Sequence, residues 1–179
     1  MAFAAVILAG GRAARLSGVD KVQLEVAGKT LLRRAIEAVA GAEPIVVVGP
    51  RRAVPGVVWT REDPPGSGPV AGLAAGLDAL PGGVTEVAVL AGDLLGVRAS
   101  TVDRLRAAVD AESAGAVLVD AGGVPQWLIG VWRAGPLRAA LPAEPAGRSL
   151  RAVLGALPFV EVPAEPGEAA DVDTPDDLP

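Results

Sequence analysis

The chain has 179 residues, of which 51% are hydrophobic and 21% are charged, enough to build one core of ordinary domain size. It contains no cysteine, histidine or tyrosine, which excludes disulfide scaffolds, zinc fingers, iron–sulfur clusters, thiolate nucleophiles and every catalytic triad that needs an imidazole. The net charge of −5 opposes binding to nucleic acid and to anionic membranes, so neither is expected as a partner.

Short apolar runs alternate along the chain with helical stretches, a pattern typical of parallel strands joined by crossover helices. The predicted strands cover residues 4–8, 45–48, 57–60, 87–90, 116–119 and 127–132. Three of them, at 4–8, 45–48 and 87–90, are apolar without alternation, as expected for strands covered on both faces. The last two predicted strands flank Gly122-Gly123 and are expected to form an antiparallel hairpin.

Helices are predicted between these strands, over residues 30–40, 71–80, 102–111 and 148–157. Pro69 stands where the second helix would begin, and Ser100 with Asp103 forms a capping signature before the third. The proline-rich stretches 136–145 and 163–166 are interpreted as surface loops. Together these elements predict an α/β fold in one domain, residues 1–179, with a mostly parallel, twisted sheet flanked by helices and a small antiparallel hairpin.

The reactive groups that remain are carboxylates, Lys, Arg, hydroxyls and backbone N–H groups, which favours phosphoryl or nucleotidyl transfer. Ligands of parallel sheets bind beyond the carboxyl ends of the strands. The loop after the first strand carries Gly10-Gly11, Arg12, Arg15 and Lys21. Glycines let backbone N–H groups reach phosphate oxygens, and the cations offset their charge, so the loop is predicted to bind an anion. A flexible surface turn is the competing interpretation.

The segment Leu8-Ala9-Gly10-Gly11, followed by Arg15, Asp20-Lys21 and Gly28-Lys29-Thr30-Leu31-Leu32, resembles the signature of the molybdenum cofactor guanylyltransferase family. The resemblance implies a three-layer, Rossmann-like nucleotidyltransferase fold. It also implies that the first loop holds the phosphates of a nucleoside triphosphate, with Lys21 bridging phosphate oxygens. The residues that would line this pocket are Leu8, Ala9, Gly10, Gly11, Arg15 and Lys21.

A second segment runs from Asp63 through Gly68-Pro69-Val70-Ala71-Gly72. It resembles the family's acidic residue followed by Gly-Pro-Leu-Ala-Gly, which implies that Asp63 and Gly68 lie at the base and ribose. Gly49 stands where many relatives have an asparagine near the base. An ordinary Pro-Gly turn before a helix would explain residues 64–69 without any function.

The third segment is Asp93, directly after the strand predicted at 87–90. A carboxylate in this place can bind Mg²⁺, which prefers hard oxygen ligands. The resemblance implies that Asp93 holds the metal ion beside the nucleotide, whereas Leu94-Leu95-Gly96 departs from the usual x-Pro-aromatic sequence. A role for Asp93 as a helix cap or turn residue is the alternative.

The end of the chain, Asp171-Val172-Asp173-Thr174-Pro175-Asp176-Asp177-Leu178, resembles the closing motif of the guanylyltransferases, except that aspartates replace both of its asparagines, as in the sister cytidylyltransferases. This similarity implies that Asp173 is a second metal ligand. The alternative is an ordinary helix N-terminus, with Thr174 as the cap before Pro175. The chain stops at Pro179, one turn into that helix, which leaves open a fused or partner C-terminal domain.

The resemblance extends over residues 4–178 and implies Mg²⁺-dependent transfer of GMP from GTP to a phosphate of molybdopterin, with release of pyrophosphate. Arg15, Lys21 and Asp93 would be the catalytic residues. The acceptor is expected near residues 123–127 and 131–133, where relatives bind the pterin substrate. Alternatives are a cytidylyltransferase, a phospholactate guanylyltransferase or a nucleotide-binding paralogue without activity. A sugar nucleotidyltransferase is disfavoured because the first loop lacks the proline-rich pattern of those enzymes.

No stretch resembles a signal peptide, and none approaches the roughly 20 apolar residues that a membrane helix needs, so a cytoplasmic enzyme is expected. The sequence leaves the oligomeric state open.

Overall fold

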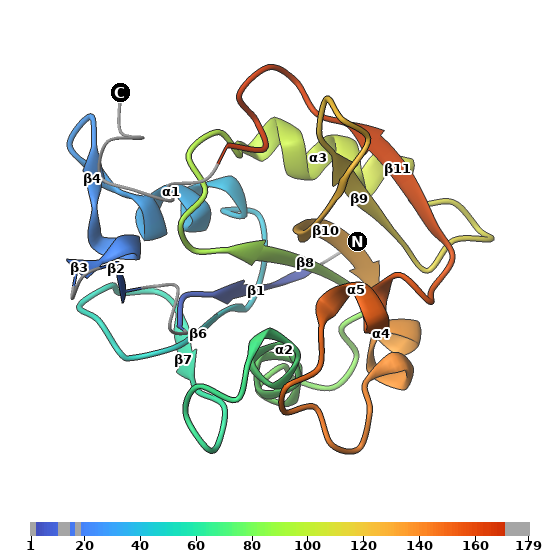
Figure 1. Cartoon of the computed structure of the whole chain (residues 1–179), viewed down its shortest axis with the longest axis horizontal. Helices are drawn as coiled ribbons and strands as arrows, with labels where there is room; N and C mark the ends of the chain where they lie inside the picture. The colour runs from blue at the N-terminus through green and yellow to red at the C-terminus, as the bar shows by residue number, and fades with distance from the viewer. Residues whose placement is uncertain (1–2, 11–14, 17–18, 171–179) are drawn as a thin grey trace.

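The computed structural model describes residues 3–10, 15–16 and 19–170. Its centre is a seven-stranded sheet in the order β11-β9-β10-β8-β1-β6-β7 (Figure 1). The strands are β1 (Ala4–Leu8), β6 (Ile45–Val48), β7 (Val58–Thr60), β8 (Glu86–Ala91), β9 (Gly115–Val119), β10 (Pro125–Arg133) and β11 (Phe159–Pro163). They all run in one direction except β10, which is antiparallel to both of its neighbours, β8 and β9.

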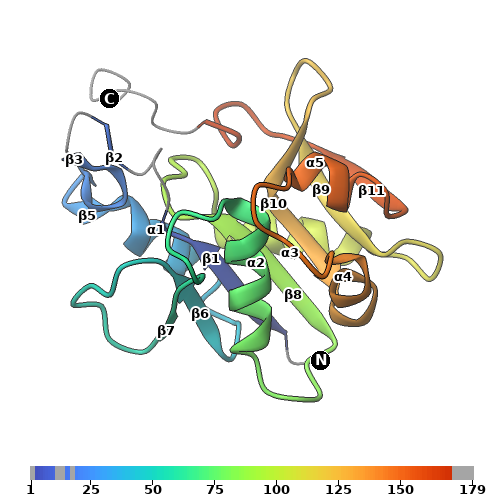
Figure 2. The ribbon, with the colours of Figure 1, turned by 60° about the horizontal axis from the view of Figure 1, so that its bottom comes forward.

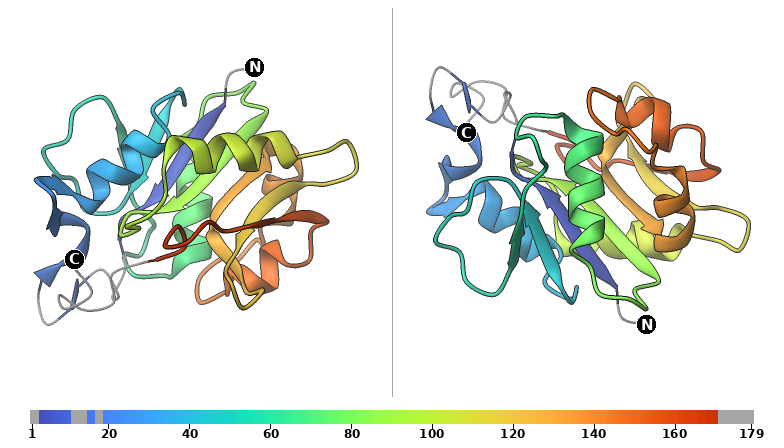
Figure 3. Two further views of the ribbon diagram at one scale, coloured as in Figure 1. Left: turned by 90° about the horizontal axis from the view of Figure 1, so that it is seen from above. Right: turned by 90° about the horizontal axis from the view of Figure 1, so that it is seen from below.

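Helices cover both faces of this sheet, which gives the molecule three layers (Figures 2 and 3). The helices are α1 (Leu31–Ala38), α2 (Pro69–Asp78), α3 (Ala99–Ala108), α4 (Ala134–Ala140) and α5 (Leu150–Leu154). The first face is covered by α1 and α3, and the opposite face by α2, α4 and α5. The predicted three layers, the mostly parallel sheet and the antiparallel hairpin of β9 and β10 are therefore confirmed.

The apolar sequence of β1 follows from its place in the middle of these layers. Ala4 and Val6 point into the core beneath α2, whereas Ala5 and Ile7 belong to the core beneath α1 and α3. All four side chains are fully buried. A strand with two covered faces has no position for a polar residue, which explains why its sequence does not alternate. In the described part of the chain, no helix is long and apolar enough to cross a membrane.

Two predicted helices, those at 102–111 and 148–157, have other boundaries in the structure, and a capping hydrogen bond marks the start of each. Helix α3 begins at Ala99 rather than residue 102, because the N–H of the N-cap residue Arg98 donates to Thr101 Oγ1 (3.1 Å). The predicted signature of Ser100 and Asp103 therefore lies inside the helix, which ends at Ala108 rather than residue 111. Helix α5 is shorter than predicted, and Ser149 caps its start by accepting the N–H of Ala152 (3.2 Å).

Several short elements had no counterpart in the prediction. Helix α4 occupies part of the stretch 136–145 that was interpreted as a loop, because Pro136 falls in its first turn, where a helix needs no N–H. Strand β11 was missed. So were two small hairpins around the 3-10 helix η1 (Lys21–Gln23): β2 (Arg15–Leu16) with β3 (Val19–Asp20), and β4 (Glu25–Val26) with β5 (Lys29–Thr30).

Candidate active site

A cavity of about 370 Å³ opens beyond the carboxyl ends of three neighbouring strands. Leu8, Ala9 and Gly10 reach it from β1, Val48 from β6, and Ala91 and Asp93 from β8. This volume lies in the range of small-molecule sites. Five residues that the sequence placed at a nucleotide, from segments up to 85 positions apart, thus line one cavity: Leu8, Ala9, Gly10, Gly68 and Asp93.

Backbone hydrogen bonds continue the strand pairing into the loops at the cavity. The N–H of Ala9 donates to Val48 O (2.8 Å), and the N–H of Gly92 donates to Leu8 O (2.9 Å). The N–H of Gly49 donates to Thr60 O (2.9 Å) at the edge of the sheet. These hydrogen bonds hold the first residues of each loop in place. A binding site needs its groups to be positioned in this way before a ligand arrives.

Gly49 allows the loops after β1 and β6 to approach each other closely. Its φ is +148°, and a Cβ on it would lie 2.8 Å from the carbonyl carbon and oxygen of Ala9 and 2.9 Å from the nitrogen of Gly10. These atoms are backbone and cannot rotate away. The asparagine of many relatives does not fit this conformation, so any contact to a base must come from other groups.

The loop between β7 and α2 brings Glu62 to the cavity. The side chain of Glu62 is only 8% exposed, and its Oε1 accepts the N–H of Gly66 (2.8 Å). Gly66, Gly68 and Pro69 complete this wall. Asp63, the residue that the sequence singled out, is exposed and is not among the residues that line the cavity. Nothing in the pattern of two consecutive acids distinguished the buried carboxylate from the exposed one.

Lys21 is buried in η1, with 5% of its surface exposed, and the adjacent Val22 lines the cavity. The preceding residue, Asp20, is held by Arg52, whose Nε and Nη2 donate to the two carboxylate oxygens (2.8 and 2.9 Å). Arg52 also donates to Pro50 O (3.0 Å). This bidentate pair ties the end of the first loop to the loop after β6. Sequence spacing gives no signal for this ion pair, because the partners are 32 residues apart.

Asp93 lies in the turn directly after β8, is half-buried and lines the cavity. Its carboxylate is the kind of hard oxygen ligand that Mg²⁺ prefers, and Mg²⁺ commonly uses only one or two protein carboxylates. The described residues contain no group of three or more acidic side chains that could hold a metal ion. Gly11, Asp173 and the side chain of Arg15 lie outside the part of the chain that the structure describes.

The reversed direction of β10 brings its first residues to the same edge of the sheet. Ile129 pairs with Leu90, and Leu128 consequently lines the cavity beside Ala91. Next to Leu128 in the chain, Trp127 packs edge-on against Phe159, with ring centroids 5.3 Å apart. These two rings and Arg151 line a second cavity of about 420 Å³ below the β9–β10 turn. Trp132 is fully buried and belongs to the core.

Solved structures of similar fold support the architecture. Molybdopterin-guanine dinucleotide biosynthesis protein A from Archaeoglobus fulgidus is 19% identical, with a TM-score of 0.75 over 98% of this chain and 95% of that one. 2-C-methyl-D-erythritol 4-phosphate cytidylyltransferase from Thermus thermophilus is 23% identical, with a TM-score of 0.71 over 99% of this chain and 96% of that one. The predicted nucleotidyltransferase fold is therefore confirmed.

Sequence comparison identifies the family. A molybdenum cofactor guanylyltransferase from Bradyrhizobium sp. (strain ORS 278) is 36% identical in an alignment of 137 residues that covers 71% of this chain. The match spans 64% of the length of that relative. The family described as "MobA-like NTP transferase domain" matches residues 5–161. Since this match includes the strands and helices that surround the main cavity, the chain belongs to the family of MobA-like NTP transferase domains.

Proposed function

We propose that this chain transfers GMP from GTP to the terminal phosphate of molybdopterin and releases pyrophosphate. The observation that carries the proposal is the convergence of the Gly10 loop, the Glu62–Gly68 segment and Asp93 on one cavity. Family membership and the 36% identity to a molybdenum cofactor guanylyltransferase support the same reaction.

In the proposed reaction, a phosphate oxygen of the acceptor attacks the α-phosphorus of GTP in line. A new P–O bond forms, and the bond to the β-phosphate oxygen breaks with its electron pair on the departing pyrophosphate. The attacking phosphate is already ionised near neutral pH, so no side chain has to remove a proton. This accounts for catalysis by a chain that contains no histidine.

The chain's own residues would bind and orient the triphosphate. The backbone of residues 9–11 would surround the phosphates, and Arg15 and Lys21 would offset their charge. Asp93, with Asp173 as a second ligand, would hold Mg²⁺. When bound, this ion would neutralise charge on the reacting phosphates. We propose that molybdopterin binds near residues 123–128, because Leu128 of β10 lines the same cavity as Asp93.

The nucleotide is identified by thermal unfolding with GTP, CTP, ATP and UTP, each with Mg²⁺. At about 100 times its dissociation constant, the true substrate stabilises the fold by roughly 2.7 kcal/mol, which raises the Tm by about 5–10 °C. We expect this shift with GTP and a much smaller one with the other three. Pyrophosphate release with GTP and molybdopterin then tests the transfer itself. The proposal is wrong if GTP gives no shift or if no pyrophosphate appears.

A cytidylyltransferase is the second candidate, because Asp171-Val172-Asp173 is similar to the closing motif of that branch. In that event CTP, rather than GTP, gives the large shift in the same measurement. A paralogue without activity would bind a nucleotide and release no pyrophosphate.

A further inference from the structure

The main cavity contains a buried carboxylate that the proposed reaction does not use, that of Glu62. Glu62 is 8% exposed and stands two residues after the end of β7. Its Oε1 accepts the N–H of Gly66 (2.8 Å), its one hydrogen bond within the described part of the chain, and no described cation pairs with it. Its Oε2 is left as an acceptor without a donor at the surface of the cavity. A buried carboxylate needs donors, and here a ligand is placed to supply them.

Glu62 lies at the end of the main cavity opposite Asp93. These two are the polar side chains among the described residues that line the cavity. Glu62 follows β7 and Asp93 follows β8, and in the sheet β6 and β1 separate these two strands. Because neighbouring strands lie about 4.8 Å apart, the ends of β7 and β8 lie roughly 14 Å apart. An acidic group without a cationic partner repels phosphates, so the triphosphate belongs at the Gly10 loop and Asp93, and the base at Glu62.

A carboxylate distinguishes the four bases by the donors on their edges, because its oxygens only accept hydrogen bonds. Guanine carries two adjacent donors, N1–H and the 2-amino group, which match the two oxygens of one carboxylate. Cytosine and adenine have a ring-nitrogen acceptor beside their amino group, and uracil has a carbonyl on each side of its N–H. Each of these three bases would bring a lone pair against the carboxylate, which lowers its affinity.

We propose that Glu62 selects guanine by accepting hydrogen bonds from N1–H and the 2-amino group, while the N–H of Gly66 fixes the orientation of the carboxylate. An ionised carboxylate offers about four acceptor positions, so Oε1 can serve both Gly66 and the base. The role falls to Glu62 rather than to its neighbour Asp63, which is exposed and does not line the cavity. This inference rests on the proposed function, because it takes GTP as the substrate and names the residue that selects it.

The test measures the affinity of the full chain for nucleoside triphosphates with Mg²⁺ by isothermal titration calorimetry. Glu62→Gln replaces one acceptor oxygen by an NH₂ donor, which opposes the 2-amino group of guanine and complements the 2-carbonyl group of xanthine. We expect the unaltered chain to prefer GTP to xanthosine triphosphate by about 10-fold or more, and Glu62→Gln to prefer xanthosine triphosphate. A general loss of structure would not create this new preference. Glu86→Gln, which changes a carboxylate at the opposite end of β8, is the control and should keep the preference for GTP.

The inference is overturned if Glu62→Gln still prefers GTP, or if Asp63→Asn loses that preference instead. Inosine triphosphate, which lacks only the 2-amino group of GTP, gives a second test that needs no variant and so does not depend on the folding of Glu62→Gln. The unaltered chain should bind it about 10-fold more weakly than GTP, and equal affinities would also overturn the inference. Failure of the unaltered chain to bind GTP would instead overturn the proposed function, and the role of Glu62 with it.

Discussion

The two sides of the sheet, divided at β8, differ in what their side chains do. On the side of β1, β6 and β7, the parallel strands β1 and β6 are followed by the small residues Ala9, Gly10 and Gly49, and loops from this side line the main cavity. On the side of β10, β9 and β11, aromatic rings fill the core, where Phe159 contacts both Trp127 and Trp132. The difference teaches that small residues leave space for the main cavity on one side, whereas the rings on the other side build the core and line the second cavity, beside which we propose that the acceptor binds.

The largest expected effect concerns stability in the aromatic half. Trp132 is fully buried, so Trp132→Ala should lower the free energy of unfolding by about 3–5 kcal/mol, measured by urea denaturation. Trp132→Phe is the control. Among the described residues, Trp132 Nε1 has no hydrogen-bond acceptor, so the phenyl ring loses area but no hydrogen bond and should cost much less. Equal losses in the free energy of unfolding of the two variants would contradict the conclusion that the buried ring of Trp132 stabilises this half of the molecule.

In the cavity half, Asp93→Asn should lower the rate of pyrophosphate release on the order of 10²-fold or more while the fold stays intact. The reason is that a neutral amide binds a divalent cation weakly. Glu86→Gln, at the other end of β8, should retain normal turnover. Both variants are compared by steady-state kinetics and thermal unfolding. Near-normal turnover of Asp93→Asn would show that the Asp93 carboxylate takes no part in the reaction.

Gly49 offers a smaller perturbation of the same half. Gly49→Asn introduces a side chain against the backbone of Ala9 and Gly10, and we expect a loss of about 1–3 kcal/mol in stability together with weaker GTP binding. Gly56→Asn is the control, because Gly56 also has a positive φ (+78°) but no atom within 4 Å of a Cβ. Isothermal titration with GTP should show normal affinity in the control. Normal GTP affinity in Gly49→Asn would mean that GTP binding does not depend on the close approach of the loops after β1 and β6.

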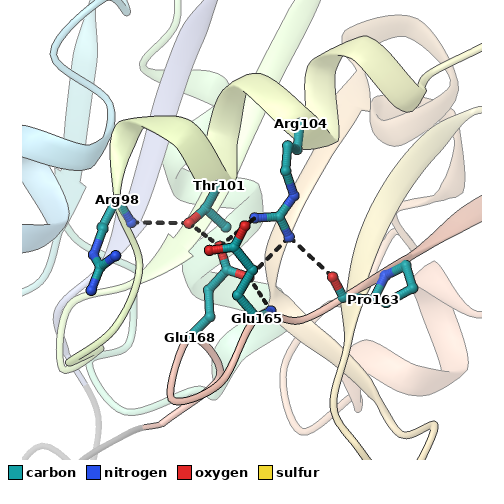
Figure 4. Close-up of polar contacts among 6 residues, drawn as sticks. All are labelled: Arg98, Thr101, Arg104, Pro163, Glu165 and Glu168. Atoms are coloured by element: carbon teal, nitrogen blue, oxygen red, sulfur yellow. Dashed lines mark hydrogen bonds and ion pairs between the residues drawn. The ribbon is translucent and has the colours of Figure 1, made fainter.

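The smallest effect is a pH dependence of stability caused by Glu168, a buried carboxylate that accepts hydrogen bonds from Thr101 and Arg104 of α3 (Figure 4). Burial raises the pKa of the Glu168 carboxyl, but hydrogen bonds from Arg104, Thr101 and the N–H of Glu165 outweigh it, so the pKa lies below its ordinary value. A lowered pKa contributes stability that is complete above the unfolded-state value, about 4.3, and is lost as the pH falls through the folded-state value. Urea denaturation at several acidic pH values should show a shallower decline for Glu168→Gln. If the free energy of unfolding falls equally with pH in Glu168→Gln and in the unaltered chain, the Glu168 carboxylate does not contribute to the pH dependence.

The sequence predicted the parts of the fold whose signal is local. Strands β1 and β8 were recognisable because a strand covered on both faces must be apolar throughout. Strand β11 was missed because Glu161 and Pro163 interrupt its apolar pattern, and because its place is decided by pairing with β9, about 40 residues earlier. Tertiary pairing of this kind has no local signature.

In the candidate site, too, the sequence predicted only those features that have a local signal. The glycine loop and Asp93 stand directly after apolar strands, so strand prediction alone placed them at one edge of the sheet. The pairing of Arg52 with Asp20, the burial of Glu62 beside the exposed Asp63, and the contact between Gly96 and Gly167 all depend on loops that meet only in the folded chain. These contacts could not be inferred from spacing.

The position of β1 between β6 and β8 also has a consequence for how the protein forms during synthesis. β1 is made first, yet its hydrogen-bonding neighbours are residues 45–48 and 86–91. Until residue 91 has left the ribosome, one edge of β1 has no partner, and the glycine loop has no support from Gly92. A nascent chain therefore completes its main cavity late and in one step, when β8 closes the sheet.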